Sequence, residues 1–208
     1  MYAPQAIENA LQKGLTAEQR QLLHAAHVAV CGLGGLGSNV AMWLARLGVG
    51  TLTLIDFDKV ELSNLNRQYY FLEDVGQYKA TALTKHLQQV NPYGKYQPHI
   101  TRLAEDNVEE LLQAVPYICE ALDDPAAKAM LVSTVLSTMP EKKVVAASGM
   151  AGFGSGNEVL SKRISNNLYL CGDGVSDFRD LPLCGARVGI CAAQQALTLA
   201  RLILKMEE

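Results

Sequence analysis

Apolar residues follow two different patterns along the first part of the chain. The run His27–Cys31 is short, apolar and partly β-branched, which is typical of a strand buried in a parallel sheet. Residues 36–47 then carry apolar side chains at helical spacing and end at Gly48, a suitable helix stop. Thr51–Ile55 is a second strand pattern. This succession of strand, glycine-rich turn, helix and strand predicts a βαβ unit.

The same alternation of strand and helix patterns continues as far as residue 147. It predicts an α/β fold of the Rossmann-like, doubly wound kind, with a mostly parallel sheet. Further helices are expected at residues 77–90, 106–114 and 125–137, and further strands at 96–101, 117–121 and 143–147.

The pattern changes after residue 147. A glycine-rich stretch at 148–156 leads into two short strand patterns at 157–163 and 168–171. Because the two are close in sequence, they are expected to form an antiparallel hairpin that extends the sheet. A polar, irregular stretch at 172–185 then precedes a closing amphipathic helix at 187–206.

Length and composition are those of a globular protein that can bury a core. The chain has 208 residues, of which 49% are hydrophobic and 19% charged. The net charge of −3 gives no reason to expect nucleic-acid binding, which usually needs a basic domain. No apolar run reaches the ~18–20 residues that span a bilayer, and residues 1–13 lack a secretory signal pattern. We therefore expect a cytoplasmic protein without a membrane segment.

The cysteines do not form the pattern of a disulfide-bonded protein. There are five of them, and none form a Cys-x-x-Cys pair. An odd number in a reducing compartment argues against a disulfide framework. Cys31 and Cys119 lie in apolar strand patterns and Cys191 lies inside the closing helix, so these three are expected in the core.

A glycine-rich turn joins the first strand of the βαβ unit to its helix. It satisfies G-x-G-x-x-G in the strand-to-helix context that nucleotide sites require. Glycines let the backbone approach a phosphate, and the helix N-terminus offers free N–H groups and partial positive charge. A turn that only permits tight helix packing is the alternative. The expected nucleotide contacts in the turn are Gly32, Gly34, Gly35, Leu36, Gly37 and Ser38.

An acidic residue, Asp56, ends the second strand at a position that suits a ribose hydroxyl. With the glycine turn alone it would favour NAD, and hence an NAD(P)-dependent oxidoreductase. The dense polar segment 56–68 argues for ATP instead, because an ordinary dinucleotide domain has no need of it. Asn64 and Arg67 are one helical turn apart and would share a face. Arginine is the preferred bidentate partner of phosphate oxygens.

Three further residues complete the candidate site. Lys79 stands near the start of the next predicted helix. Asp123 and Asp124 end the fourth predicted strand, at the edge where open α/β sheets bind ligands. A carboxylate and substrate phosphates are the usual ligands of Mg²⁺. The structural alternatives are a surface ion pair for Arg67, a solvated helix position for Lys79 and a helix N-cap for Asp124.

The order of these motifs resembles the ThiF/MoeB/HesA superfamily of ubiquitin-activating-like adenylating domains, and its short ThiF type most of all. The resemblance is strong over residues 27–137 and resumes in the closing helix. The segments that carry it are Gly32–Ser38, Leu47–Gly50, Asp56–Val60, Leu62–Gln68, Asp74–Gly76 with Lys79, Asn91–Pro92, Gly185–Gly189 and Gln194–Ala196.

The resemblance implies an enzyme, an adenylyltransferase that works with ATP and Mg²⁺. Its substrate would be the C-terminal glycine carboxylate of a ubiquitin-like sulfur carrier such as ThiS, in thiamine biosynthesis. Attack on the α-phosphate would give an acyl-adenylate and pyrophosphate. The catalytic residues implied are Arg67, Lys79 and Asp123, with Asp123 as the Mg²⁺ ligand. The nucleotide contacts implied outside the glycine turn are Asp56, Asp58, Asn64, Arg67, Lys79, Leu122 and Asp123.

The sequence also departs from the superfamily pattern. Many relatives bind structural zinc through two Cys-x-x-Cys pairs. Here Leu168 replaces the first cysteine of one pair and the second pair is absent, so no zinc site is expected. The Arg-x-x-Arg-Gln signature of homodimeric relatives is missing, which leaves a homodimer open. Some relatives pass on sulfur through a late cysteine, so Cys184 and Cys171 are candidates, with a sulfur-donor protein as a further partner; a structural thiol is the alternative for each.

One domain is expected over residues 1–208. Within it we expect N-terminal helices at 1–26, a nucleotide-binding core at 27–147, and carrier-binding strands, a loop and the closing helix at 148–208. Two other functions stay open. One is activation of a modified nucleoside carboxylate on tRNA, against which the lack of a basic patch weighs. The other is a non-catalytic adaptor, against which the intact set of polar residues argues.

Overall fold

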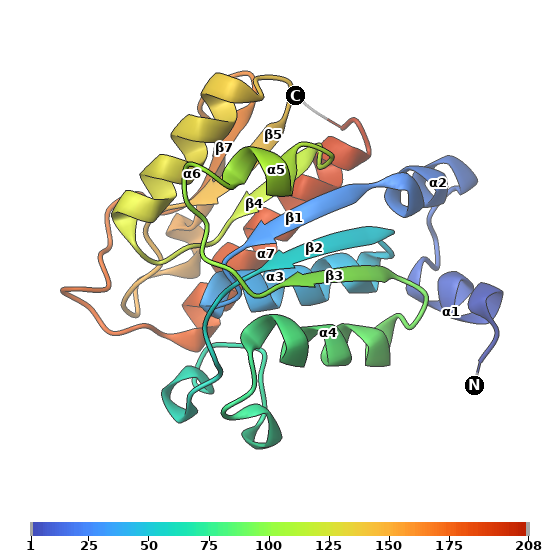
Figure 1. Cartoon of the computed structure of the whole chain (residues 1–208), viewed down its shortest axis with the longest axis horizontal. Coiled ribbons are helices and arrows are strands. Elements are labelled where there is room, and N and C mark those ends of the chain that lie inside the picture. The colour runs from blue at the N-terminus through green and yellow to red at the C-terminus, as the bar shows by residue number, and fades with distance from the viewer. Residues whose placement is uncertain (1, 207–208) are drawn as a thin grey trace.

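A seven-stranded sheet forms the centre of the computed structural model, which describes residues 2–206 (Figure 1). The strand order is β3-β2-β1-β4-β5-β7-β6. All neighbouring strands are parallel except β6 and β7, which form an antiparallel hairpin. The strands are β1 (His27–Cys31), β2 (Thr51–Ile55), β3 (Lys95–His99), β4 (Tyr117–Glu120), β5 (Lys143–Ala147), β6 (Leu160–Arg163) and β7 (Leu168–Gly172). The predicted doubly wound α/β fold is confirmed.

Helices cover both faces of the sheet (Figure 1). The helices α3, α4 and α7 pack on one face, and α5 and α6 pack on the other. Of the helices in residues 2–206, none is both long enough and apolar enough to cross a bilayer. The α-helices are α1 (Pro4–Leu11), α2 (Ala17–Ala25), α3 (Gly35–Leu47), α4 (Lys79–Val90), α5 (Val108–Leu112), α6 (Pro125–Thr138) and α7 (Gly185–Ile203), and the short 3₁₀ turns are η1 (Leu62–Asn64), η2 (Leu72–Asp74) and η3 (Gly156–Glu158).

Successive side chains of the central strand β1 are buried on opposite faces of the sheet, as the pleat of a strand requires. Val28 and Val30 of β1 pack into the core on the α3 and α7 side, whereas Ala29 and Cys31 pack on the α5 and α6 side. Cys119 and Cys191 are also fully buried. The expectation that these three cysteines belong to the core is confirmed.

Some predicted boundaries were wrong, two of them because of a local hydrogen bond. Helix α4 begins at Lys79 instead of 77, because the Gln77 carbonyl accepts the Val60 N–H at 2.8 Å. Helix α5 begins at Val108, after Asn107 has accepted the Ala104 N–H at 3.0 Å and closed a turn. The strand expected at 157–163 is shorter, since its first residues form η3. Helix α7 spans 185–203 instead of 187–206.

The sheet has a switch point between β1 and β4. From β1 the chain proceeds to β2 and β3 on one side, and then returns to add β4 and β5 on the other. Ligands of open α/β sheets bind beyond the carboxyl ends of strands at such a point. The glycine-rich turn after β1 and the end of β4 lie there together, since a Cβ on Gly32 would be 2.6 Å from the Ala121 carbonyl oxygen.

Candidate nucleotide site

The glycine-rich turn is tightly packed at two of its glycines and leads into a helix N-terminus that can bind an anion. Gly32 has a φ of +91°, and a Cβ on Gly37 would lie 1.8 Å from the Gly32 carbonyl oxygen, so both positions need glycine for packing alone. A Cβ on Gly34 would instead have its nearest neighbour 3.7 Å away, at the Gln68 side chain. Within residues 2–206, no side chain caps the N-terminus of α3. Its N–H groups therefore remain available to an anion.

Asp56 connects the end of β2 to this turn. Its carboxylate accepts the Leu33 N–H at 2.7 Å and the Asp58 N–H at 2.8 Å. Burial raises the pKa of Asp56, although the charge of Lys79 and these two N–H groups act against the rise. A carboxylate has about four lone-pair positions, so two remain for ribose hydroxyls. Asp56 thus lies where a ribose acid is expected, and its contact with a nucleotide stays a prediction.

Lys79 is buried at the same edge. Its side-chain nitrogen pairs with an Asp58 carboxylate oxygen at 2.9 Å, and its N–H donates to the Asp58 carbonyl at 2.9 Å. The residue is only 7% exposed, which excludes an ordinary solvated helix position. Asp58 is much more exposed than its partner. A phosphate that displaces this carboxylate would therefore meet a cation already fixed beside Asp56.

Arg67 lies against the first residue of α3. A Cβ on Gly35 would lie 3.4 Å from the Arg67 Cγ, so the aliphatic stem passes over the glycine turn. The guanidinium donates to the Ser63 carbonyl at 3.1 Å and to the Asn66 side chain at 2.8 Å. In the described part of the chain no carboxylate forms an ion pair with Arg67, so the surface ion pair considered above is not formed. Its charge is available beside the turn.

Ser38 holds the turn against the crossover segment, by which we mean residues 57–78 between β2 and α4. Its hydroxyl donates to the Gly34 carbonyl at 2.6 Å and accepts the Tyr69 N–H at 2.9 Å. The side chain is fully buried. These bonds give Ser38 a positional role, and a direct nucleotide contact through its hydroxyl has no support from this geometry.

Asn64 and Leu122 also make internal contacts. The Asn64 side-chain oxygen accepts the Glu61 N–H at 3.1 Å, which closes η1, and Asn64 is buried. Leu122 is half-buried, and its N–H donates to a Glu120 carboxylate oxygen at 2.8 Å. Asn64 belongs to the crossover segment after β2, and Leu122 follows β4. Their contacts with a nucleotide stay predictions.

The two aspartates after β4 have different surroundings. Asp124 caps α6 by accepting the Ala127 N–H at 2.8 Å, as the structural alternative expected. Asp123 is exposed, next to the backbone of Leu122, whose nitrogen would lie 3.0 Å from a Cβ on Gly32. An exposed carboxylate beside the glycine turn would fit Mg²⁺ that is held mainly through substrate phosphates. Residues 2–206 contain no cluster of three or more His, Cys, Asp or Glu suited to a metal, and the absence of zinc stays a prediction.

The two candidate sulfur-transfer thiols differ in exposure. Cys171 is fully buried on β7, and burial raises the pKa of its thiol, while hydrogen bonds with Ser161 and Thr198 offset only part of the rise. A buried neutral thiol is a poor nucleophile, which argues against sulfur transfer at Cys171. Cys184 is partly exposed at the N-cap position of α7 and remains the candidate.

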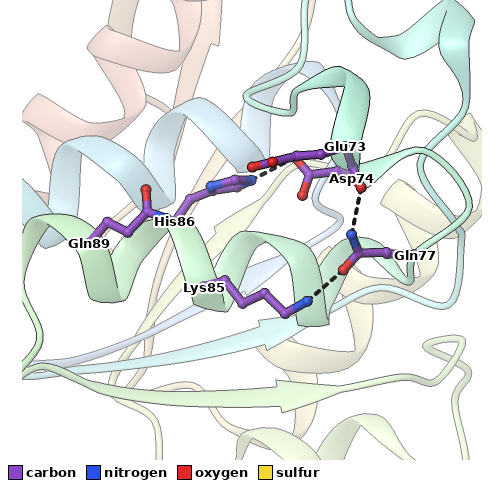
Figure 2. Close-up of a pocket in the computed structure, with 6 residues that line it drawn as sticks. All are labelled: Glu73, Asp74, Gln77, Lys85, His86 and Gln89. Atoms are coloured by element: carbon purple, nitrogen blue, oxygen red, sulfur yellow. Dashed lines mark hydrogen bonds and ion pairs between the residues drawn. The ribbon is translucent and has the colours of Figure 1, made fainter.

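A hollow of about 320 Å³ is lined by residues of the crossover segment and of α4 (Figure 2). His86 and Asp74 meet across it at 2.6 Å, and the Lys85 ammonium donates to the Gln77 side chain at 2.7 Å. These contacts fix η2 to α4, the helix that begins with Lys79, and so help to position that lysine. The residues around the hollow are Glu73, Asp74, Gln77, Lys85, His86 and Gln89.

Comparison with known proteins decides the family. The model of the ThiF family matches residues 7–208. The chain belongs to the ThiF family. The resemblance inferred from the motifs is thereby confirmed, and the NAD(P)-dependent oxidoreductase loses its support.

Curated relatives of this ThiF-family chain are longer proteins. It is 36% identical over 140 residues to "Adenylyltransferase and sulfurtransferase uba4" of Aspergillus terreus, which is 67% of this chain and 28% of that protein. It is 39% identical over 108 residues to "Sulfur carrier protein adenylyltransferase" of Thermus thermophilus, which is 51% of this chain and 40% of that protein. The matches therefore cover well under half of those relatives.

A solved structure matches the fold over almost the whole chain. It is that of E. coli tRNA N6-threonylcarbamoyladenosine dehydratase in complex with ATP, with a TM-score of 0.88. The match covers 97% of this chain and 95% of that one at 19% sequence identity. At this identity the likeness establishes the fold alone.

Three polar residues of this region were missed by the sequence-based predictions. Asn39 donates to the carbonyls of Gly35 at 2.7 Å and Arg67 at 3.1 Å, and so connects the turn to the crossover segment. Glu120 is buried beside the turn and pairs with the half-buried Lys128 at 2.9 Å. An acidic residue inside an apolar strand pattern needs a charged or hydrogen-bonding partner. The position of Glu120 in the sequence could therefore have predicted such a pair.

Proposed function

We propose that this protein is an adenylyltransferase that uses ATP to adenylate the C-terminal glycine carboxylate of a ThiS-like, ubiquitin-like sulfur carrier. The observation that carries the proposal is the convergence of Asp56, Arg67 and Lys79 on an uncapped helix N-terminus at the switch point of the sheet. ATP as the nucleotide is supported by family membership and by the similarly folded dehydratase, which was solved with ATP.

The charges of the site suit this reaction. An anionic carboxylate must approach an anionic phosphate, and like unit charges 4 Å apart repel by ~1 kcal/mol in bulk water and about 4 kcal/mol at an effective dielectric of 20. Arg67 and Lys79 would offset that repulsion and the charge on the departing pyrophosphate. Asp123 would hold Mg²⁺, which supplies further neutralisation at the phosphates.

The bond changes need no general base. A carboxylate is already ionised at neutral pH. One of its oxygens bonds to the α-phosphorus, while the bond from the α-phosphorus to the bridging oxygen of the β-phosphate breaks. Pyrophosphate leaves with that oxygen, and the carrier keeps the adenylate as a mixed anhydride. The chain's own residues hold the two reactants and balance their charge.

A protein substrate is favoured by the surface near the N-terminus of α7. Phe153 and Val175 are 80% and 86% exposed, and Phe178 and Leu181 are also exposed on the same loops. Apolar side chains suit a protein partner better than a polyanionic RNA. Sulfur-carrier activation for thiamine biosynthesis, with a separate sulfur donor, is the role in which we propose this chemistry.

ATP–pyrophosphate exchange tests the proposal. Purified protein should exchange label between pyrophosphate and ATP only when Mg²⁺ and a ThiS-type carrier ending in Gly-Gly are both present. Mass spectrometry of that carrier after incubation with ATP should find an added AMP. A carrier that lacks the terminal glycine is the matched control. Exchange that does not depend on the carrier would count against the proposal.

A second candidate is ATP-dependent activation of a modified nucleoside on tRNA. It is favoured by the fold match to the E. coli dehydratase, which covers nearly all of both chains. The discriminating measurement is ATP consumption with tRNA that carries N6-threonylcarbamoyladenosine, compared with unmodified tRNA. Consumption that requires the modified tRNA, together with no response to a carrier, would replace the first proposal by the second.

A further inference from the structure

A buried arginine stands in the first turn of α7. Arg187 is 5% exposed, although the N-terminal end of a helix disfavours a positive charge. A buried cation also loses its hydration unless partners replace it. Arg187 therefore needs hydrogen-bond acceptors, and the segments next to the helix provide them.

One guanidinium contacts three separate segments of the chain. Arg187 donates to the Ala151 carbonyl at 2.5 Å, to an Asp173 carboxylate oxygen at 2.9 Å and to a Glu158 carboxylate oxygen at 3.2 Å. Asp173 is nearly buried, whereas Glu158 is exposed. We call Arg187, Asp173, Glu158 and the Ala151 carbonyl the Arg187 clamp.

Asp173 extends the clamp through the backbone. Its second carboxylate oxygen accepts the N–H groups of Val175 and Ser176, each at 2.8 Å. Burial acts to raise the pKa of Asp173, but these N–H groups, the Ser176 hydroxyl and the charge of Arg187 outweigh it and lower that pKa. The Ser176 hydroxyl in turn accepts the Ala151 N–H at 3.0 Å. The glycine-rich loop 149–156 and the loop after β7 are thus held as one unit.

The clamp lies next to the candidate nucleotide site. A Cβ on Gly185 would lie 2.4 Å from the Asn66 carbonyl oxygen, and Val188 would lie 3.0 Å from a Cβ on Gly35. Residues on both sides of Arg187 in α7 therefore contact the crossover segment and the glycine turn. The loop that the guanidinium holds follows the carboxyl end of β5, at the same edge of the sheet as the glycine turn, and Phe153 on this loop is exposed.

We propose that Arg187 is a positioning residue that holds loop 149–156 as the wall along which the extended C-terminal tail of the carrier reaches the nucleotide. The inference rests on the proposed function and adds the residue that orders its protein-substrate side. The hydrogen bonds of Arg187 within residues 2–206 go to Ala151, Asp173 and Glu158, and none of these residues belongs to the glycine turn. Loss of Arg187 should therefore impair use of the carrier and leave nucleotide binding intact.

Two conservative variants and their combination test this role. Arg187→Gln removes the charge, and Asp173→Asn removes the partner while preserving its shape. Each should raise the KM for a Gly-Gly carrier in ATP–pyrophosphate exchange at least tenfold. The double variant should add little to Arg187→Gln, because that substitution already removes the contact between Arg187 and Asp173. The affinity for ATP, measured by calorimetry, should stay within twofold. Arg179→Gln, which breaks an exposed ion pair with Asp177 in the same loop, is the matched control and should leave the carrier KM unchanged.

The possible outcomes separate the inference from the proposed function. A carrier KM within twofold of the unsubstituted protein in both single variants overturns the role of Arg187. A parallel loss of ATP affinity also overturns it, since that result means a general structural effect. If Arg187→Gln does not fold, Asp173→Asn and its KM decide the question. If the unsubstituted protein shows no carrier-dependent exchange, the proposed function fails and the inference fails with it.

Discussion

The glycine turn and the C-terminal loops lie at the same edge of the sheet but are fixed by different forces. In the turn, backbone meets backbone, and an added Cβ at Gly32 or Gly37 would overlap a carbonyl oxygen. In the loops, the guanidinium of Arg187 connects three segments through charge and hydrogen bonds. Steric exclusion therefore fixes the glycine turn, whereas the positive charge of Arg187 fixes the loops. Substitutions should therefore damage stability in the turn and substrate handling in the loops.

The largest expected effect is that of Gly37→Ala. Its Cβ would lie 1.8 Å from the Gly32 carbonyl oxygen, and neither backbone has room to shift. Overpacking of this kind costs about 1–3 kcal/mol and more where the contact is backbone. Urea unfolding should show a loss of about 3 kcal/mol or more. Gly34→Ala is the control, because its Cβ has 3.7 Å of clearance, and it should keep stability while it weakens ATP binding.

The next effect is on catalysis at Arg67. Arg67→Gln should reduce kcat for ATP–pyrophosphate exchange by about 10²–10³, the usual loss when one donor to developing charge is removed. Stability should change little, since the side chain is partly exposed. Arg46→Gln, at the far end of α3, is the matched arginine control. Full exchange activity in folded Arg67→Gln would remove this residue from the site.

A smaller effect on exchange activity is expected to distinguish the two adjacent aspartates after β4. Asp123→Asn should lower exchange at least tenfold and raise the Mg²⁺ concentration needed for half-maximal rate, because a charged oxygen ligand is lost. Asp124→Asn should leave exchange unchanged, since asparagine is as good an N-cap as aspartate. Equal effects in the two variants would contradict the assignment of Mg²⁺ to Asp123.

Acidification should weaken ATP binding through Asp56. Because burial raises its pKa, this carboxyl takes up a proton at a higher pH than an exposed aspartate does. The protonated form loses acceptor capacity for ribose, so affinity should fall as the pH drops toward that raised pKa and recover above it. Calorimetry from pH 7 down to pH 5 measures the trend, with ATP phosphate titration corrected by parallel runs on Asp56→Asn. An identical pH profile in the variant would contradict the role.

The smallest expected effect on adenylation is at the thiols. Cys184→Ser should leave ATP–pyrophosphate exchange unchanged while it abolishes carrier thiocarboxylate formation from a sulfur donor. Cys171→Ser is the buried counterpart and should leave both activities intact, at a modest cost in stability. Normal thiocarboxylate formation by Cys184→Ser would return both cysteines to structural roles.

The sequence predicted the strands and helices of the core well because their patterns are local. The turn and Asp56 lie on one βαβ unit, so their meeting follows from the fold class, and Leu33 does bond to Asp56. The insertion of β7 beside β5 could not be read from spacing, and it places Cys171 in the core cluster that α7 covers. The Arg187 partners likewise come from loops that only the packed structure brings to α7.

The two outer strands of the sheet carry features that keep copies of the protein apart. Strand β3 forms one margin and contains Pro98, which has no N–H to offer a further strand. Strand β6 forms the other margin, where all four residues are exposed and Lys162 places a charge on the open ladder. Such margins resist the addition of a foreign strand, which is the first step of sheet-mediated aggregation. An open-edged sheet can therefore remain dispersed without a further element to cover its outer strands.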